Sequence, residues 1–242
     1  MSDFDRQRHG YSQPEPLHAH GGSGAQPLTA AEVSVSERIA FIRKVYALFF
    51  VATLFAIGGA LLGLAFPPLM LLAVQHPIVT FIVLIGGVMG AQAVRHVPGV
   101  NLAALFGFTT LTGIMISPAL YVIGQTNPAS ILQAGVMTVV IFGGLTAYVF
   151  VSGRDFNFLR GMVTVGLLVV IGAGLTNIFV GSLGLGFAIA AAALLLFAGF
   201  VLYDTSNIIR RYPTNEYVAG ALSLYLDAFN IFLALLRLLN RR

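Results

Sequence analysis

Apolar residues are grouped along most of the chain in long runs that are separated by short polar stretches. From Arg38 onward, seven of these runs are long enough to span, or nearly span, about 30 Å of hydrocarbon as α-helices. They cover 45–66, 78–94, 102–123, 130–151, 161–181, 184–207 and 217–238. Strands of an outer-membrane barrel would instead show alternating polarity. The pattern therefore predicts an all-α polytopic membrane protein with seven transmembrane helices, of which the second is the shortest.

Residues 1–37 differ from the rest of the chain. They are rich in Gly, Pro, Ser, His and Gln and have no apolar period, which predicts a disordered polar tail before a membrane domain at 38–242. A signal peptide is not expected, because the first apolar run begins late and no small-residue cleavage site precedes a folded domain. His9, His18 and His20 form only a weak metal-binding tract, and we favour a solvated tail.

Composition agrees with a membrane location. The chain has 242 residues, of which 57% are hydrophobic and only 9% are charged. Its mean hydropathy of +0.89 is beyond the range of ordinary water-soluble domains. The formal net charge of +4 comes almost wholly from arginine, and we interpret it as topology information rather than as a nucleic-acid footprint. Cysteine is absent, so disulfides and thiol chemistry are excluded.

Basic residues divide the connections between the apolar runs into two kinds. Alternate connections, PPLMLLAVQHP, GQTNPA and GSLG, have no Lys or Arg, whereas the others contain or adjoin Arg38, Arg43, Lys44, Arg95, Arg154, Arg160, Arg210 and Arg211. The positive-inside rule places the basic connections and the N-terminus in the cytoplasm. Arg237, Arg241 and Arg242 break the pattern, because a seventh full crossing delivers them outside. Either the last helix crosses against the rule, or it dips in and returns.

Two aspartates lie within the predicted membrane helices, where an ionisable side chain costs about 2.5–3.5 kcal/mol on insertion scales. Asp204 precedes the arginines that end the sixth run, and Asp227 lies well inside the seventh. The connection RYPTNE is short, so two antiparallel helices can bring the acids together. Helical spacing puts Ser223 and Asn230 on the face of Asp227, and Asn207 follows Asp204 by three residues. We therefore predict a polar face that is turned towards protein or water.

Two carboxyl groups within hydrogen-bonding reach share one proton in a medium of low dielectric, because both cannot ionise cheaply. Such a pair responds to pH. Fully ionised, its oxygens suit Ca²⁺, although two carboxylates fall short of the roughly six to eight oxygens that this ion prefers and describe a transit site rather than a storage site. The alternative is that each acid stays protonated and only hydrogen-bonds a neighbouring helix. Arg211 is expected to snorkel towards the lipid headgroups.

Small and amide residues within the runs have structural explanations. Asn177 is expected to hydrogen-bond between helices. Two Gly-x-x-x-Gly pairs, Gly59 with Gly63 and Gly86 with Gly90, are expected to allow close helix packing.

Catalytic motifs are not recognisable in the sequence. The run GSLGLG at 181–186 superficially resembles a phosphate loop, but it joins two membrane helices with no strand before it, and we reject that interpretation. There is no Ser/His/Asp set and no HExxH motif, and His76 and His96 are expected at solvated membrane edges. We expect neither an enzyme nor a tightly bound cofactor.

The C-terminal third resembles a known family. LYDTSNII at 202–209 and VAGALSLYLDAFNIFLALLRLLNRR at 218–242 closely resemble the C-terminal signature of the Bax inhibitor-1 (transmembrane BAX inhibitor motif) family, in its bacterial branch. The likeness extends through LTGIMISPALYVIG at 111–124 and SGRDFNFLRG at 152–161, and it covers essentially all of 38–242. The resemblance implies a seven-helix bundle whose C-terminal helix is central and is wrapped by the other six.

The resemblance also implies a pH-sensitive calcium leak gated by a pair of aspartates, which fall here on Asp204 and Asp227. In the family an arginine at the cytoplasmic end of the second helix can latch to the first of these acids, and the matching residue is Arg95, in the context RHVPG. Certain bacterial relatives carry a glutamate in the second helix along the proposed ion path. PIVTFIVLIGGVMG has none, a departure that bears on permeation rate and ion selectivity.

The leading hypothesis is therefore a calcium leak of the cytoplasmic membrane, with Ca²⁺ as permeant ion, held only transiently by Asp204 and Asp227, and with protons as the signal. The alternative is a regulatory membrane protein that binds a membrane protein such as a protease, or modulates a stress or cell-death response, with 1–37 as its handle. A proton-coupled transporter of small solutes calls for an inverted repeat, and we find none. Beyond the lipid bilayer and these ions, no nucleic-acid partner is expected.

Overall fold

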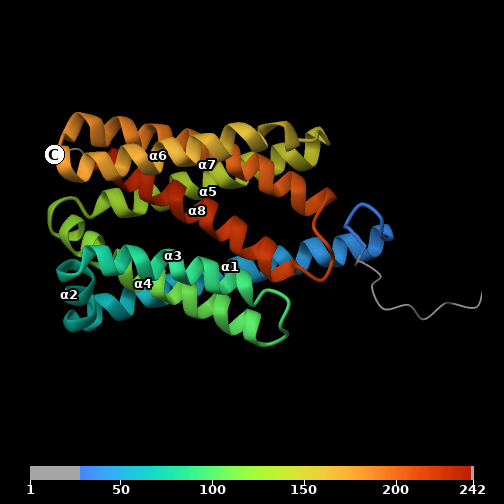
Figure 1. Cartoon of the computed structure of the whole chain (residues 1–242), viewed down its shortest axis with the longest axis horizontal. Helices are drawn as coiled ribbons and strands as arrows, with labels where there is room; N and C mark the ends of the chain where they lie inside the picture. The colour runs from blue at the N-terminus through green and yellow to red at the C-terminus, as the bar shows by residue number, and fades with distance from the viewer. Residues whose placement is uncertain (1–27, 241–242) are drawn as a thin grey trace, which may run out of the picture.

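The computed structural model describes residues 28–240, and this part of the chain is helical (Figure 1). The elements are α1 (Val35–Ala65), α2 (Pro67–Gln75), α3 (Pro77–Ala93), α4 (Val100–Thr126), α5 (Ala129–Ser152), the 3₁₀ turn η1 (Asn157–Leu159), α6 (Arg160–Val180), α7 (Leu183–Arg210) and α8 (Tyr217–Leu239). No strand occurs in the described residues. Six helices are long and apolar enough to cross a membrane, and α2 with α3 makes a seventh if they form one broken span. The prediction of an all-α polytopic membrane protein is confirmed.

The main departure from the predicted elements is α2. The stretch PPLMLLAVQHP was expected to be a connection, but Pro67–Gln75 is a helix that is bent by 100° from α3. Pro67 and Pro77 stand in the first turns of α2 and α3, where the missing proline N–H has no helical acceptor to lose. The two prolines therefore start new helices instead of opening a loop, and His76 is the only residue between them.

The start of α1 is fixed by a capping box. Ser34 Oγ accepts a hydrogen bond from the Glu37 N–H at 3.3 Å, and Glu37 Oε2 accepts one from the Ser34 N–H at 3.1 Å. The two side chains satisfy backbone donors that the first helical turn leaves free. The helix consequently begins at Val35, well before the apolar run predicted from residue 45.

Residues that precede α1 contact the connection between α7 and α8. Ala30 is fully buried and its N–H donates to the Tyr212 carbonyl at 2.9 Å, and Thr29 pairs with Pro213. The predicted polar tail therefore divides. Residues 1–27, with the three histidines, lie outside the described residues, whereas Thr29 and Ala30 contact the bundle and α1 begins at Val35.

The close helix packing predicted at Gly59 and Gly63 is confirmed, and the structure shows that the partner helix is α4. A Cβ added at Gly59 would lie 2.0 Å from the Thr110 carbonyl oxygen, and one at Gly63 would lie 2.2 Å from Ser117 Oγ. Both distances are shorter than any real Cβ contact, so the backbones of the two helices approach as closely as glycine permits.

The second glycine pair was predicted wrongly. A Cβ at Gly86 or Gly90 would meet only open space, whereas one at Gly87 would lie 2.7 Å from Phe108 on α4. The packed face of α3 is therefore displaced by one residue from the Gly-x-x-x-Gly spacing.

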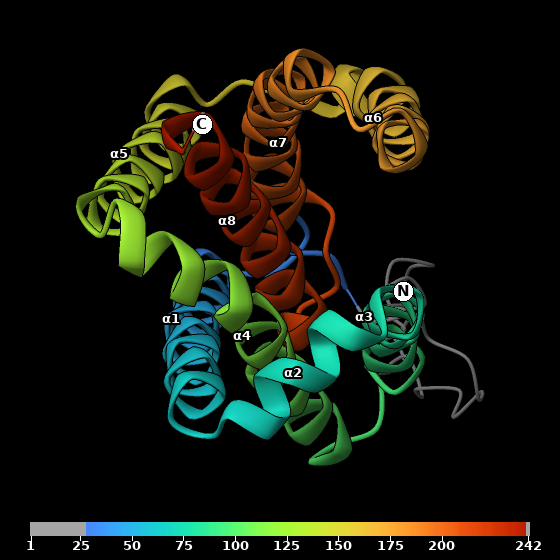
Figure 2. The same ribbon diagram turned by 90° about the vertical axis from the view of Figure 1, so that its left-hand side faces the viewer.

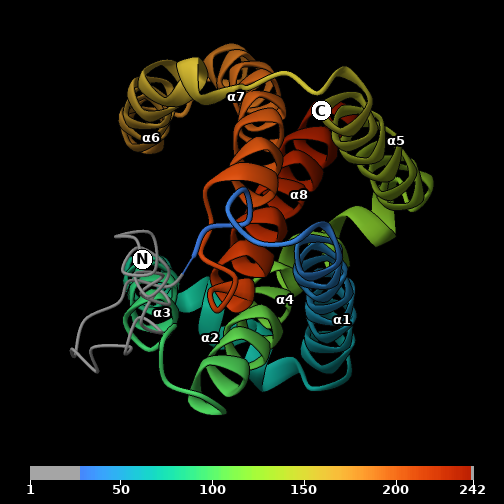
Figure 3. The ribbon, with the colours of Figure 1, turned by 90° about the vertical axis from the view of Figure 1, so that its right-hand side faces the viewer.

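Helix α8 is the most buried of the candidate membrane helices. Within its most apolar 18 residues 61% are buried, against 6% for α6. It packs against α1, α4, α5 and α7, whereas α3 packs chiefly against α4 and α6 chiefly against α7. Views along the bundle from its two ends show α3 and α6 on one flank, apart from each other, with α7 and α8 beside them on the side towards α1 and α5 (Figures 2 and 3).

One end of the bundle, which we call the basic end, gathers the charged connections. The Lys44 ammonium lies 3.3 Å from the centroid of the Tyr217 ring, which joins α1 to the start of α8. Arg95, between α3 and α4, pairs with Glu216, and Arg211, after α7, pairs with the α5–α6 connection. These contacts place the basic connections together, as the charge pattern predicted.

The opposite end, which we call the far end, receives the C-terminal end of α8. Ser130 Oγ at the start of α5 donates to Asn240 Oδ1, just after α8, at 2.9 Å. α8 is one continuous helix of 23 residues from the basic end to this point. Of the two alternatives left open by the sequence, α8 therefore runs the full length of the bundle instead of returning, and it carries Arg237 to the far end.

Candidate functional site

Asp204 on α7 and Asp227 on α8 line the same cavity, which has a volume of about 420 Å³. Ser223 and Asn230 line it too, so the polar face predicted on α8 meets the acid predicted on α7. Apolar side chains of α3, α6, α7 and α8 form the remaining walls. We call this space the acid cavity. It has room for several water molecules or a partly hydrated ion.

Asp227 is the more enclosed of the two acids. The residue is only 3% exposed, and its Oδ2 atom is buried without a hydrogen-bond partner among the described residues. A buried carboxyl oxygen without a donor is costly when it is ionised. A proton of its own, a water molecule in the cavity or a bound cation can relieve that cost, and each of these changes with pH or with ion concentration.

Ser223 and Asn230 are held in place by hydrogen bonds. Asn230 Nδ2 donates to the Leu226 carbonyl at 2.8 Å, which sets the orientation of its carboxamide. Ser223 Oγ lies 3.2 Å from the Tyr212 hydroxyl oxygen. Burial raises the pKa of Tyr212, in the connection after α7, to about 12, so its hydroxyl keeps its proton. The acid cavity is thus linked through Ser223 to the basic end.

Asn207 does not line the acid cavity. It is buried beside the end of α7, and its Oδ1 accepts a hydrogen bond from Arg211 Nη1 at 3.3 Å. Arg211 was expected to extend towards the lipid headgroups, and the structure gives its guanidinium group a partner that was not predicted, Asp155 in the α5–α6 connection. The two residues therefore support the end of the helix that carries Asp204 rather than the cavity itself.

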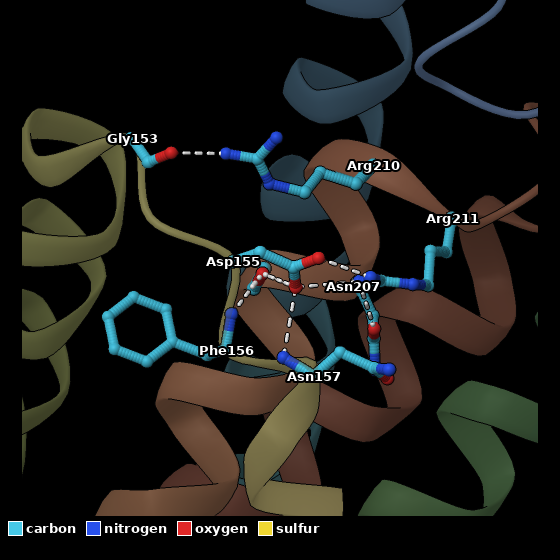
Figure 4. A network of polar contacts seen from close by, with 8 residues as sticks. Gly153, Asp155, Phe156, Asn157, Asn207, Arg210 and Arg211 are labelled. Carbon is cyan, nitrogen blue, oxygen red and sulfur yellow. Dashed lines mark hydrogen bonds and ion pairs between the residues drawn. The ribbon is translucent and has the colours of Figure 1, made fainter.

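Asp155 is the residue at this end that the sequence reasoning missed (Figure 4). Its Oδ1 lies 3.0 Å from Arg211 Nη1, its Oδ2 contacts Arg211 Nη2, and Oδ1 also accepts a bond from the Asn157 N–H at 2.9 Å. The Arg211 hydrogen bond, followed by that from Asn157, lowers the pKa of Asp155 to about 2. The sequence did contain a signal for this contact. Asp155 is the only acid in the connection after α5, and the consecutive residues Arg210 and Arg211 lie at the end of α7 on the same side of the predicted membrane.

Backbone contacts complete this arrangement. The Phe156 N–H donates to Ser206 Oγ at 3.1 Å, and the Arg210 guanidinium group donates to the Gly153 carbonyl (Figure 4). We call residues 153–157, together with Ser206, Arg210 and Arg211, the α5–α7 clasp. Ser206 is only two positions after Asp204, so the clasp fixes the depth and rotation of the helix segment that presents this acid.

Arg95 lies apart from the aspartate pair. Its Nε atom is 3.8 Å from Glu216 Oε2 and donates to His96 Nε2 at 3.0 Å. No ion pair between Arg95 and Asp204 occurs in the described residues. Glu216 immediately precedes α8, so the arginine ties the end of α3 to the first turn of the helix that carries Asp227.

Helices of membrane-spanning length, with two acids that line one largely apolar cavity, define the chain as a polytopic membrane protein with an ionisable site. The family model described as Inhibitor of apoptosis-promoting Bax1 matches residues 38–242, and the chain belongs to this family. The resemblance noted in the sequence is thereby confirmed.

The chain is similar to proteins from bacteria, animals and viruses. It is 35% identical over 207 residues to an uncharacterised protein of Helicobacter pylori, covering 85% of this chain and 88% of that protein. It is 34% identical over 213 residues to mouse protein lifeguard 4, covering 87% and 88%. It is 32% identical over 215 residues to the Golgi anti-apoptotic protein of vaccinia virus, covering 88% and 90%.

Proposed function

We propose that this protein is a pH-sensitive calcium leak of the cytoplasmic membrane, whose open fraction is set by protonation of Asp204 and Asp227. The observation that carries the proposal is the acid cavity, in which both carboxyl groups line one space and Asp227 Oδ2 has no donor. Protons and divalent cations compete for the same oxygens in such a site, so pH controls the occupancy of the ion path.

The proposed ion is held briefly rather than stored. Two carboxyl groups, with the oxygens of Ser223 and Asn230 and with water, offer a mixed oxygen shell of the kind that Ca²⁺ accepts. Among the described residues there is no cluster of three or more His, Cys, Asp or Glu that suits a resident metal ion. A weak site favours passage, because an ion that binds tightly leaves slowly.

The architecture that we propose has seven membrane crossings, with α2 and α3 as one broken crossing and α8 as the central helix. The burial of α8 and its packing against four neighbours support the central position. The concentration of basic residues at one end supports a cytoplasmic location for that end and for the N-terminus. Arg95 then acts as a cytoplasmic counter-charge, through its pair with Glu216.

Flux measured in proteoliposomes tests the proposal. Vesicles that contain only this protein should release Ca²⁺ at a rate that depends on pH, and Asp204→Asn and Asp227→Asn should flatten that dependence. Thr138→Val, which changes a buried polar residue that does not line the acid cavity, is the matched control and should keep the wild-type profile. An Asp227→Asn protein that retains the wild-type pH profile contradicts the mechanism.

The second candidate function is regulation of another membrane protein, such as a protease, or of a stress or cell-death response. The name of the viral relative, a Golgi anti-apoptotic protein, favours this class. Since Thr29 and Ala30 contact the bundle, deletion of 1–27 is the appropriate test. Loss of partner capture with unchanged Ca²⁺ flux supports regulation through the tail, whereas unchanged capture argues against it.

A further inference from the structure

Arg237 lies in the last turn of α8 at the far end, where the charge pattern of the other connections disfavours a basic residue. Its side chain is folded back onto a neighbouring helix. A Cβ added at Gly186, on α7, would lie 2.6 Å from Arg237 Nη2 and 3.4 Å from Cζ. The guanidinium group therefore uses space that exists only because residue 186 has no side chain.

Asn177, near the end of α6, reaches the same notch. Its Nδ2 atom lies 3.2 Å from the Cβ position of Gly186. The orientation of this carboxamide is determined, because Oδ1 accepts a hydrogen bond from the Ser182 N–H at 3.1 Å and a backbone N–H can only donate. The NH₂ group of Asn177 and the guanidinium group of Arg237 thus converge beside Gly186 from two different helices.

These converging donors have no acceptor among the described residues. The side chain of Arg237 forms neither an ion pair nor a hydrogen bond there, and Nδ2 of Asn177 has no bonded partner. The acids of residues 28–240 lie elsewhere. They are Glu32, Glu37, Asp155 and Glu216 towards the basic end, and Asp204 and Asp227 at the acid cavity. Arg237 is exposed and Asn177 is half-buried, so a charged donor and a neutral donor beside Gly186 are available to an external acceptor.

Donors of this kind select an oxyanion. The planar fork of a guanidinium group matches two oxygens of a phosphate, and charge-assisted bonds to such oxygens are about twice as strong as neutral ones. Helix ends of membrane-spanning length lie at the headgroup layer, where phosphate is the abundant oxyanion. We propose that Gly186, Asn177 and Arg237 form a binding site for the phosphate group of a phospholipid, between the far ends of α6, α7 and α8.

Each residue has a distinct part in the proposed site. Gly186 supplies room for the guanidinium group, Arg237 supplies the charge and the paired donors, and Asn177 supplies a neutral donor whose direction is fixed by Ser182. The site differs from a phosphate loop, because its donors are side chains from two helices rather than successive backbone N–H groups. A bound phosphate neutralises Arg237, which lies at the end of the bundle opposite to the basic connections and is therefore an exception to the positive-inside pattern.

The two glycines at the start of α7 provide a matched test. Gly186→Ala places a Cβ against the guanidinium group and closes the notch. Gly184→Ala adds the same methyl group at a nearby position of α7, where the closest neighbour of the new Cβ is Ser182 Oγ at an ordinary 3.9 Å. Both changes improve helix propensity by a similar amount, about 1 kcal/mol, so a difference between them reports on the notch alone.

Titration of the full chain in detergent micelles with phosphatidylglycerol, followed by native mass spectrometry, gives the affinity for one bound lipid. Wild type and Gly184→Ala should bind with equal affinity, and Gly186→Ala and Arg237→Gln should bind about tenfold more weakly, as expected for the loss of a charge-assisted bond. Arg237→Lys should be intermediate, because it keeps the charge and loses the fork. Diacylglycerol, which lacks the phosphate, should not bind.

A second measurement separates the lipid from a soluble ion. If millimolar inorganic phosphate displaces the bound phosphatidylglycerol, the ligand is a free phosphate and the assignment to lipid is wrong. Equal lipid affinity in all the variants, with melting temperatures that show each of them folded, overturns the site altogether. Neither result depends on Ca²⁺ flux, so the proposed leak and this site stand or fall separately.

Discussion

Arg95, at the end of α3, forms its ion pair with Glu216, the residue that precedes α8, and not with Asp204. The pair joins a peripheral helix to the start of the helix that carries Asp227. Because α3 also forms part of the wall of the acid cavity, a shift of α3 relative to α8 changes both this pair and the cavity. The family resemblance implies that Arg95 pairs with Asp204, whereas in this structure Arg95 pairs with the residue that precedes α8.

Glu216→Gln should raise Ca²⁺ flux at neutral pH by at most about fivefold, since an ion pair whose arginine is solvent-exposed contributes only about 0.2–1 kcal/mol and its loss frees the end of α3. Flux in proteoliposomes is the measurement. Glu37→Gln is the control, because the carboxylate of Glu37 bonds only to Ser34 at the start of α1. Flux that does not differ between the two variants would mean that the Arg95–Glu216 pair has no part in gating.

The α5–α7 clasp should contribute stability that is constant over physiological pH. The pKa of Asp155 is about 2, below its ordinary value of 3.8, so the contribution is complete above about pH 4 and is lost as the pH falls towards 2. Asp155→Asn should lower the free energy of unfolding at pH 7 by about 0.5–1 kcal/mol, because the pair is exposed. Thermal unfolding in detergent at pH 7 and at pH 2 should show a difference that disappears in acid.

Asp155→Asn also distinguishes a structural role of the α5–α7 clasp from a role in sensing pH. If Asp155→Asn leaves the pH midpoint of Ca²⁺ flux unchanged, the clasp is a support and the sensor lies in the membrane. A moved midpoint would place Asp155 within the sensor.

Gly59→Ala should destabilise the protein by about 1–3 kcal/mol, because its Cβ would lie 2.0 Å from a backbone oxygen of α4 and the two helices must separate. Gly58→Ala, where the added methyl group meets nothing within 4 Å, should be neutral or slightly stabilising. Thermal unfolding in detergent distinguishes them. Equal melting temperatures would contradict the close crossing of α1 and α4.

Ile171→Trp should reduce Ca²⁺ flux severalfold without moving its pH midpoint, because Ile171 lines the acid cavity from α6 and a larger side chain fills part of the space. Ile178→Trp is the matched control, since Ile178 lies on the same helix, is 74% exposed and does not line the cavity. Reduced flux in both variants would indicate a general defect of α6 rather than obstruction of an ion path.

The elements that the sequence predicted well are those set by local pattern. Apolar runs gave the long helices, and helical spacing put Ser223, Asp227 and Asn230 on one face, because periodicity is a property of the helix itself. The spacing also placed Asp204 where a short connection brings it to the same cavity. These expectations needed no knowledge of distant contacts.

The predictions that failed depend on how distant parts of the chain meet. Nothing near Gly86 in the sequence tells that Gly87 is the residue that faces Phe108. The ion pair of Arg211 was not predicted, because its partner Asp155 lies on another connection and is found only once α5 and α7 are packed. Helix α2 was missed because PPLMLLAVQHP was assigned to a connection, although the first turn of a helix accepts proline.

The contact of Ala30 and Thr29 with Tyr212 and Pro213 attaches the first described residues to the connection between α7 and α8. These two residues are attached to the linker between the helices that carry the two acids, and Tyr212 lies beside Ser223 of the cavity wall. The first described residues and the connection between the two acid-bearing helices are therefore held together at the basic end of the bundle.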